Sequence, residues 1–195
     1  MGEGPLTAEQ ILSAAEDVLR RYGPAKATVV DVARALGVSH GSVYRHFPSK
    51  AALRDAVTRR WLDRTSETLA QVVATDSPAE QRLRAWLETL YDAKRAKALD
   101  DPELFAAYSQ LVDETGSSVE QHLAELVGQL TGIIEDGMAE GAFARTDPAA
   151  AADAVFAATA RFHDPVHARE WRDPASRDSF DNVCRLVLAG LAPRA

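Results

Sequence analysis

The residues best suited to recognise a chemical partner lie in one short stretch, GVSHGSVYRHFPSK, which runs from Gly37 to Lys50. The stretch has few aliphatic residues, and most of its side chains form hydrogen bonds or carry positive charge. They are Ser39, His40, Ser42, Tyr44, Arg45, His46 and Lys50. Gly41 adds no bulk, so a partner can approach the backbone closely. Side chains of these types bind phosphate oxygens and base edges, which is the chemistry of nucleic-acid recognition.

Two short helices are expected to hold this stretch in place. The first covers 28–36 and the second covers 40–46, with Ser39 as the capping residue before it. Gly37 follows the first helix directly, at the position where a glycine commonly ends a helix. An earlier amphipathic helix over 7–22 can pack across both. The pattern is typical of a helix-turn-helix, whose second helix enters the DNA major groove. The alternative is a small surface helix in an ordinary bundle.

The charge distribution supports a nucleic-acid partner for the N-terminal third of the chain. The 195 residues carry a net charge of −7. Residues 1–64 hold ten Lys and Arg against seven Asp and Glu, whereas residues 65–195 hold twelve against twenty-two. The first part is therefore +3 and the second −10. A surface that meets phosphates needs positive charge only where it touches them, although chance segregation would look the same.

The rest of the chain predicts helices and no convincing strand. After a long helix over 49–73, four capping residues each stand directly before a proline, a pattern that opens helices. The pairs are Ser77-Pro78, Asp101-Pro102, Asp147-Pro148 and Asp173-Pro174. The helices expected in this part are 78–97, 102–113, 117–139, 147–162 and 174–192. The sequence therefore predicts an all-α protein of about nine helices.

Several simple features indicate a cytoplasmic protein. Cys184 is the single cysteine, so no internal disulfide can form. The N-terminal residues lack the basic and apolar regions of a signal peptide. No apolar run approaches the roughly 20 residues that a membrane-spanning helix needs.

One segment resembles a known family. TVVDVARALGVSHGSVYRHFPSKAAL is similar to the signature of the tetracycline-repressor (TetR) family of bacterial transcription regulators, and the resemblance covers roughly residues 7–57. The matching positions are Thr28, Val32, Ala33, Gly37, Val38, Ser39, Gly41, Val43, Tyr44, His46, Phe47, Lys50 and Leu53. It implies a helix-turn-helix DNA-binding domain at 1–50, joined by the helix over 49–73 to a helical effector-binding and dimerisation domain at 74–195. It also implies a homodimer that represses transcription at a palindromic operator and is released by an unknown small-molecule effector, with no cofactor.

The resemblance implies DNA contacts from the second short helix and its neighbours. These are Thr28, Ser39, His40, Gly41, Ser42, Tyr44, His46 and Lys50. Arg45 and Lys26 are added from their position and charge, although Lys26 is equally well explained as a solvated lysine. Base reading is expected from His40, Ser42 and Arg45, with His40 at a place where Lys or Arg would be a stronger groove reader. Contacts to the phosphate backbone are expected from Thr28, Tyr44, His46 and Lys50.

In the TetR family the last two helices form a four-helix interface between subunits. Here the helix over 147–162 is rich in alanine, and the helix over 174–192 carries an apolar stripe wider than one neighbour within the chain needs. The stripe comprises Phe180, Val183, Cys184, Val187, Leu188 and Leu191. The alternative is that the stripe is internal core, and Cys184 in particular is interpreted as a buried small apolar residue.

Aromatic residues between 78 and 162 are candidates for lining an effector pocket. The candidates, together with one histidine, are Trp86, Tyr91, Phe105, Tyr108, His122 and Phe156. Aromatic side chains at helical spacing are usually core, so only some of them are expected to line a cavity for an apolar or amphipathic molecule.

A local cluster in the segment RFHDPVHAREW raises a weaker hypothesis. His163, Asp164 and His167 could bring two imidazoles and a carboxylate to one metal ion. The alternative, a polar connection between helices with solvated histidines, is favoured, and no metal is expected.

Other classes of function fit less well. The chain shows no nucleophile elbow, phosphate-binding loop or zinc-protease motif, so an enzyme is not expected. A DNA-architectural protein would need basic charge over its whole surface. A ligand-binding protein that has lost its DNA site would show damage in the 28–50 region, and none is visible.

Overall fold

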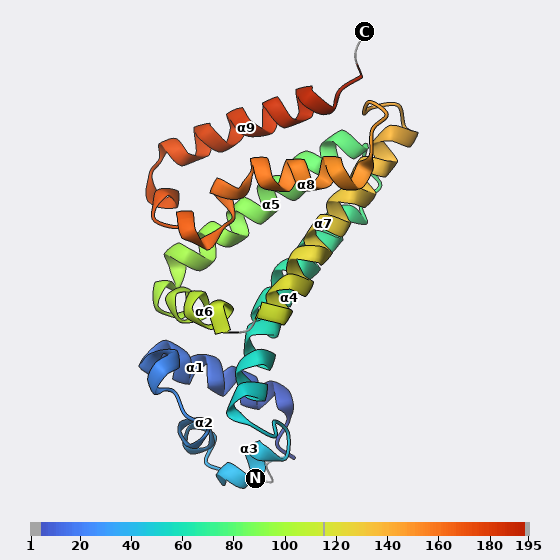
Figure 1. Ribbon diagram of the computed structural model, residues 1–195. Helices are drawn as coiled ribbons and strands as arrows, with labels where there is room; N and C mark the ends of the chain where they lie inside the picture. Colours follow the sequence, from blue (N-terminus) through green and yellow to red (C-terminus); the bar gives the residue numbers. More distant parts are fainter. Residues whose placement is uncertain (1–4, 115, 194–195) are drawn as a thin grey trace. The chain divides into compact units, whose positions relative to one another are not determined.

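The computed structural model describes residues 5–114 and 116–193, which form nine α-helices and no β-strand (Figure 1). The helices are α1 (Ala8–Lys26), α2 (Val29–Ala35), α3 (His40–Tyr44), α4 (Lys50–Val73), α5 (Ala79–Asp100), α6 (Pro102–Glu114), α7 (Gly116–Ala139), α8 (Pro148–Ala158) and α9 (Ala175–Leu191). Three short 3₁₀ turns between α8 and α9 are η1 (Ala160–Phe162), η2 (Pro165–His167) and η3 (Glu170–Arg172). The predicted all-α architecture is confirmed.

Capping side chains fix where the helices begin. Thr7 and Gln10 form the expected capping box, since the Thr7 hydroxyl accepts from the Gln10 N–H at 3.2 Å and the Gln10 side chain accepts from the Thr7 N–H at 2.9 Å. Asp101 accepts from the N–H of Leu104 at 3.2 Å, and Asp147 accepts from two N–H groups at the start of α8. Each cap satisfies backbone donors that the first helical turn leaves without a partner inside the helix.

Four helices end two or more residues away from the predicted position. α5, which was expected to end at 97, continues to Asp100. α1 continues beyond the expected stop to Lys26, but it does so across a kink at Gly23, whose φ of 71° is left-handed. α3 ends at Tyr44, two residues early, because the following N–H groups bond in tight turns. α8 ends at Ala158, and the chain continues as the 3₁₀ turn η1.

The chain divides into two compact units. The N-terminal unit contains the residues up to Leu62 together with Asp101–Val119, and the C-terminal unit contains Asp63–Asp100 and the residues from Glu120 onward. The sequence assigned 102–113 to the C-terminal domain, whereas the structure groups α6 with the helices of the N-terminal unit because α6 packs along α1. Nothing in the local sequence of α6 indicates this partner, since its apolar face would suit either unit.

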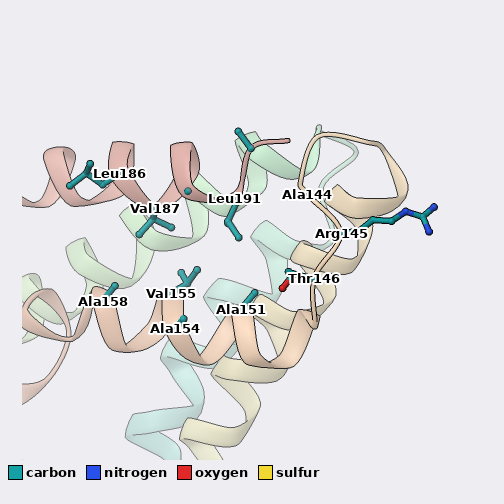
Figure 2. A pocket seen from close by; sticks show the side chains of 12 residues that line it. Ala144, Arg145, Thr146, Ala151, Ala154, Val155, Ala158, Leu186, Val187 and Leu191 are labelled. Carbon is teal, nitrogen blue, oxygen red and sulfur yellow. The ribbon is translucent and has the colours of Figure 1, made fainter. Parts of the chain in front are cut away.

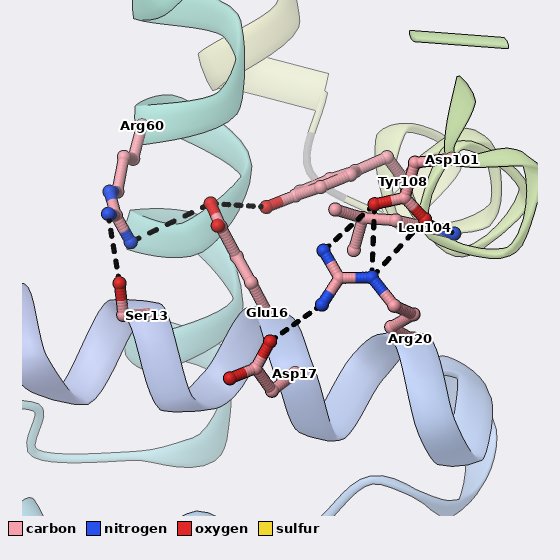
Figure 3. A network of polar contacts seen from close by, with 8 residues as sticks. All are labelled: Ser13, Glu16, Asp17, Arg20, Arg60, Asp101, Leu104 and Tyr108. Carbon is pink, nitrogen blue, oxygen red and sulfur yellow. Dashed lines mark hydrogen bonds and ion pairs between the residues drawn. The ribbon is translucent and has the colours of Figure 1, made fainter. Parts of the chain in front are cut away.

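Polar and aromatic side chains connect α1, α4 and α6 in the N-terminal unit (Figure 3). Arg20 pairs with Asp101 at 2.8 Å, and this pairing holds the pKa of the Asp101 carboxyl below its usual range. The Tyr108 hydroxyl donates to the buried carboxylate of Glu16 at 3.2 Å. The Tyr108 ring stacks on Trp61 with 4.4 Å between centroids. The helices α1 and α4 therefore share one core with α6.

Aromatic rings also form the core of the C-terminal unit. Tyr91 of α5 stacks on Phe180 of α9 with 4.6 Å between ring centroids, and Phe162 packs edge-on against both. Gly137 leaves room for a fourth ring: a Cβ there would lie 2.1 Å from Cδ2 of Phe143. α7 passes through Gly137. The left-handed glycine beyond the helix is Gly141, with φ of 75°.

Among the described residues, no helix combines the length and apolar character that a membrane span requires.

Candidate nucleic-acid interface

A capping box orients α2. The Thr28 hydroxyl accepts from the Asp31 N–H at 3.2 Å and donates to the Asp31 carboxylate at 2.5 Å. The hydrogen bond from Thr28 lowers the pKa of Asp31, and Arg34 forms an ion pair with the same carboxylate at 3.0 Å. Because the Thr28 hydroxyl is already donating to a carboxylate, a phosphate could accept from it only by displacing Asp31.

The turn between α2 and α3 depends on Gly37. Its φ of 67° lies in the left-handed region, which glycine enters without steric cost. The Gly37 N–H bonds the Arg34 carbonyl at 3.2 Å, and the Val38 N–H bonds the Ala33 carbonyl at 3.0 Å. These two bonds form a Schellman motif. The predicted role of Gly37 as the residue that ends the helix is confirmed, and the motif fixes the direction in which α3 leaves α2.

Local contacts pre-arrange the polar side chains of α3. The Ser39 hydroxyl accepts from the Ser42 N–H at 3.2 Å and lies 3.0 Å from the Ser42 hydroxyl, which accepts from Arg45 at 3.1 Å. Ser39, Ser42 and Arg45 thus form one row along the helix. His40 and Tyr44 form a second row, in which one ring is edge-on to the other with 6.3 Å between the ring centroids. Two parallel rows of hydrogen-bonding side chains could contact two parts of a groove at the same time, for example its base edges and one of its phosphate strands.

Burial separates the inner and outer faces of α3. Val43 is completely buried and fixes the helix to the rest of the N-terminal unit, while Phe47 is half-buried. The predicted DNA contacts lie outside this anchor. Those that are exposed are Lys26, Thr28, Ser39, His40, Gly41, Tyr44, Arg45, His46 and Lys50, and Ser42 is half-buried. The sequence-predicted contact residues are therefore accessible to a partner, Ser42 in part.

The start of α4 borders this surface. The Ser49 hydroxyl caps α4 by accepting from the Ala52 N–H at 3.0 Å, and Lys50 is the first helical residue. Lys50 and Thr28 line the same small cavity of about 30 Å³, so the starts of α4 and α2 are adjacent. Lys50 and Thr28 are therefore neighbours, with the Lys50 side chain exposed and the Thr28 hydroxyl bonded to Asp31.

The structure distributes the six candidate effector-pocket residues over both units. Phe105 and Tyr108 belong to the core of the N-terminal unit. Tyr91 is committed to the aromatic core of the C-terminal unit, and Trp86 donates to Gln129 at 2.8 Å. His122 and the half-buried Phe156 are the remaining two. Four of the six candidates are therefore core residues, namely Phe105, Tyr108, Tyr91 and Trp86.

The apolar stripe of α9 also divides. Phe180, Cys184 and Leu188 are buried within the protomer, and burial raises the pKa of the Cys184 thiol to about 11. Val183, Val187 and Leu191 are half-buried. Figure 2 shows that Val187 and Leu191 face α8 across a groove of about 610 Å³, whose α8 side is lined mainly by alanines. Leu186, which the sequence analysis did not include, lines the same groove and is 73% exposed.

The three candidate metal ligands have separate partners. Nε2 of His163 lies 3.1 Å from the Phe156 carbonyl, and since a carbonyl only accepts, Nε2 carries the proton. Asp164 caps η2, and His167 bonds Glu170 at 3.0 Å. Within residues 5–114 and 116–193, no three His, Cys, Asp or Glu side chains are placed to hold a metal ion. His163, Asp164 and His167 are therefore not brought together as ligands of one ion among the described residues.

Comparison with known protein families agrees with this geometry. Residues 11–57 match the family model described as bacterial regulatory proteins, tetR family, and residues 79–184 match the tetracyclin repressor-like C-terminal domain. The second match alone covers more than half of the chain. The chain belongs to the TetR family of bacterial transcription regulators.

Two relatives and one solved structure are similar to this chain over nearly its full length. The transcriptional regulator RutR of Escherichia coli K12 is 28% identical, with 94% of this chain and 90% of RutR covered. The transcriptional repressor KstR2 of Rhodococcus jostii is also 28% identical, with the same coverage. The structure of FadR from Bacillus subtilis, solved in complex with stearoyl-CoA, is 17% identical with a TM-score of 0.72, covering 95% of this chain and all of that one. The last likeness establishes the shared fold.

Proposed function

We propose that this regulator is a homodimeric repressor that binds a palindromic operator in the cytoplasm and is released by a small-molecule effector. The observation that carries the proposal is the arrangement of α3, where Val43 is buried and the polar residues around it remain exposed. A helix that needed only to pack would not present two rows of hydrogen-bonding groups to solvent. A helix that enters a major groove must present them.

The predicted contacts fall into two roles. Tyr44, His46 and Lys50 would position the phosphate backbone, with Thr28 and Lys26 beside them. His40, Ser42 and Arg45 would read bases. The hydrogen bond from Arg45 to Ser42 at 3.1 Å supports this division, because it holds the guanidinium over α3 before DNA arrives. A pre-positioned side chain loses less conformational entropy on binding.

Dimerisation is proposed through α8 and α9, with a second copy of the chain as the occupant of their groove. Leu186, Val187 and Leu191 supply apolar surface on α9, and the alanines of α8 allow close approach of another helix. A two-fold dimer would present two copies of α3, which is the symmetry that a palindromic operator mirrors.

Release by an effector requires that ligand binding favour a conformation with lower DNA affinity. Chain connectivity offers a route. Asp101 directly follows the last residue of α5, which belongs to the C-terminal unit, and is held by Arg20 of α1. A ligand that shifted the end of α5 would therefore act on the helix that packs against α1.

Gel-shift titration with the region upstream of the protein's own gene tests this function. We expect saturable binding that unlabelled specific DNA competes away and nonspecific DNA does not. Transcription in vitro from the same region should fall when the protein is added. A rise in transcription would replace repression by activation, and the absence of any sequence-specific shift with upstream DNA would contradict the proposal.

A further inference from the structure

Three basic side chains are buried together in the C-terminal unit. Lys94 of α5, His122 of α7 and His163 after η1 are 6%, 4% and 7% exposed. Burial lowers the pKa of both histidines, and the charge of Lys94 lowers each further, so its ammonium is within electrostatic reach of both rings. Three nitrogen groups from separate elements are therefore buried inside one unit, and a lysine is almost never fully buried unless it is paired.

His122 provides the sharpest sign of a missing partner. Its Nδ1 lies 2.9 Å from the Ser66 hydroxyl of α4. Its Nε2 is buried and has no hydrogen-bond partner among the described residues. Burial lowers the pKa of His122 to about 3, so the ring is neutral at pH 7. When the Ser66 hydroxyl donates to Nδ1, the proton of the ring resides on Nε2, which then needs an acceptor.

Lys94 adds charge to the same place. Burial lowers the pKa of its amine to about 8, and the nearby Asp164 opposes the shift. A pKa of about 8 leaves most of the population protonated at pH 7. The charge of the neighbouring Lys97 also lowers the pKa of His122, but its ammonium donates to Thr65 at 2.6 Å. When the Ser66 hydroxyl is the donor to Nδ1, the interior therefore contains the Lys94 cation beside a neutral N–H donor.

Aromatic groups border the cluster. The Phe156 ring lies 4.3 Å from the ring of His163. Gln129 donates to the Ser66 carbonyl at 3.1 Å and accepts from Trp86 at 2.8 Å. Through Gln129, the Trp86 ring is therefore linked to Ser66, the residue that contacts His122. An apolar molecule with one polar end would match this combination of rings and donors.

We propose that Lys94 and His122 bind the carboxylate of a small organic acid, and that this acid is the effector of the regulator. A carboxylate has two oxygens, so it can accept from the Lys94 ammonium and the His122 Nε2–H at once. Because the Asp164 carboxylate also acts on Lys94, a singly charged carboxylate is repelled less than a doubly charged phosphate and is favoured over it. Phe156 and Trp86 would flank the apolar body of the acid. The inference rests on the proposed function, because it names the ligand class of the effector-binding unit.

The alternative occupant of the His122 site is an ordered water, which would also satisfy Nε2. A water gives no preference for negative charge. Acid binding does, and the preference should depend on Lys94 and not on Lys97. These two lysines lie one turn apart on α5, so Lys97 is a matched control of the same residue type and helix.

The experiment is isothermal titration calorimetry on the full-length protein. The probes are straight-chain monocarboxylates from acetate to dodecanoate, benzoate and phenylacetate, each compared with its primary amide. We expect at least one acid to bind about tenfold or more tighter than its amide. Lys94→Met should bring this ratio close to one, His122→Phe should weaken the acid about fivefold or more, and Lys97→Met should keep the ratio.

Three results would overturn the inference. They are equal binding of acid and amide to the unaltered protein, an unchanged ratio in Lys94→Met, and no acid in the series binding with a Kd below about 1 mM. If Lys94→Met does not fold, the unaltered protein and His122→Phe decide the question. Operator release by neutral or cationic compounds with no acid binding would overturn this inference alone. Acid binding by a protein that shifts no upstream DNA would instead contradict the proposed function.

Discussion

The recognition helix α3 and the buried cluster around Lys94 both gather polar side chains, but they satisfy them in opposite ways. On α3 the polar groups are exposed and contact each other within one helical turn, as Ser39, Ser42 and Arg45 do. In the cluster, Lys94 and His122 come from helices distant in sequence and are removed from water. The exposed groups on α3 depend on the fold only for their position, whereas the buried groups Lys94 and His122 contribute directly to the free energy of unfolding.

This difference teaches which observable each region should control. An exposed group that already interacts with solvent adds little to stability, so its replacement should change binding alone. A buried ionisable group is held in one protonation state by the fold, so its replacement should also change the response of stability to pH. The predictions below test this separation, from the largest expected effect to the smallest.

The largest effect is expected in the groove between α8 and α9. Val187→Glu places a charge in the proposed subunit interface, where an unpaired buried charge costs about 3 kcal/mol or more, on the order of a hundredfold in dimer affinity. Since Val187 is only half-buried in the protomer, the monomer should remain folded. Analytical ultracentrifugation and circular dichroism measure the two properties.

Arg185→Glu is the matched control for that change. Arg185 is exposed on α9 and lies about 160° around the helix from Val187 and about 100° from Leu186, so a glutamate there should leave the dimer intact. A Val187→Glu protein that remains dimeric at micromolar concentration would refute the proposed interface. A Val187→Glu protein that unfolds would refute the expectation that surface changes affect association alone.

The second effect is the pH dependence that His122 gives to stability. In the unfolded chain this ring takes up a proton near pH 6.5, whereas burial keeps the folded ring neutral down to about pH 3. Between these values the unfolded state binds more protons, so stability falls as pH falls. His122 should account for about 2 kcal/mol of lost stability between pH 7.5 and pH 5.

Urea denaturation at these two pH values, on the unaltered protein and on His122→Gln, measures the effect. The variant should lose about 2 kcal/mol less across the interval. An equal loss in both proteins would mean that the folded ring titrates normally, and the contrast between exposed and buried groups would then disappear at this residue.

The same contrast explains what the sequence could and could not predict. The helix-turn-helix could be predicted because its signals are local. Thr28 and Asp31 cap α2, Gly37 ends α2, and Ser39 caps α3, all within a dozen residues. Helix positions elsewhere followed from caps and periodicity in the same way. Local chemistry decides these features, so a single sequence contains them.

Features that depend on long-range packing were missed. His122 was predicted as a pocket residue, but its closeness to Lys94 requires α5 and α7 to meet, which no local pattern encodes. The packing of α6 on α1 and the burial of Phe180, Cys184 and Leu188 inside the protomer have the same origin. An amphipathic face indicates that a helix packs against another element, but it does not indicate which element is the partner.

The third effect concerns one phosphate contact. Lys50→Ala should weaken operator binding about tenfold and flatten the dependence of log affinity on log salt concentration by about one unit. Stability should stay within about 0.5 kcal/mol because Lys50 is exposed. Fluorescence anisotropy at several salt concentrations measures both binding quantities. His40→Ala is the comparison, because it should change which bases are preferred and leave the salt slope as it is; identical behaviour of the two variants would remove the division between phosphate and base contacts.

The smallest effect separates two glycines four residues apart. Gly37 has φ of 67°, so Gly37→Ala forces a side chain into the left-handed region and should lower the free energy of unfolding by about 1 kcal/mol. Gly41 lies inside α3, and a Cβ there would meet only the Ser39 hydroxyl at an ordinary 3.7 Å. Gly41→Ala should therefore leave stability unchanged or raise it by up to about 1 kcal/mol, as alanine does in a helix.

For DNA binding the order of the two glycines should reverse. The added methyl of Gly41→Ala occupies the exposed face of α3, where the backbone would approach DNA closely, so operator affinity should fall although the protein is no less stable. Gly37→Ala, measured well below its melting temperature, should bind DNA with nearly unchanged affinity because the folded turn is the same. Thermal denaturation and anisotropy measure the stability and the operator affinity of both variants. If binding and folding are separate on α3, Gly37→Ala should be the less stable variant and Gly41→Ala the weaker DNA binder. If Gly41→Ala bound the operator as tightly as the unaltered protein, α3 would not approach DNA along the face that carries Ser39 and Ser42.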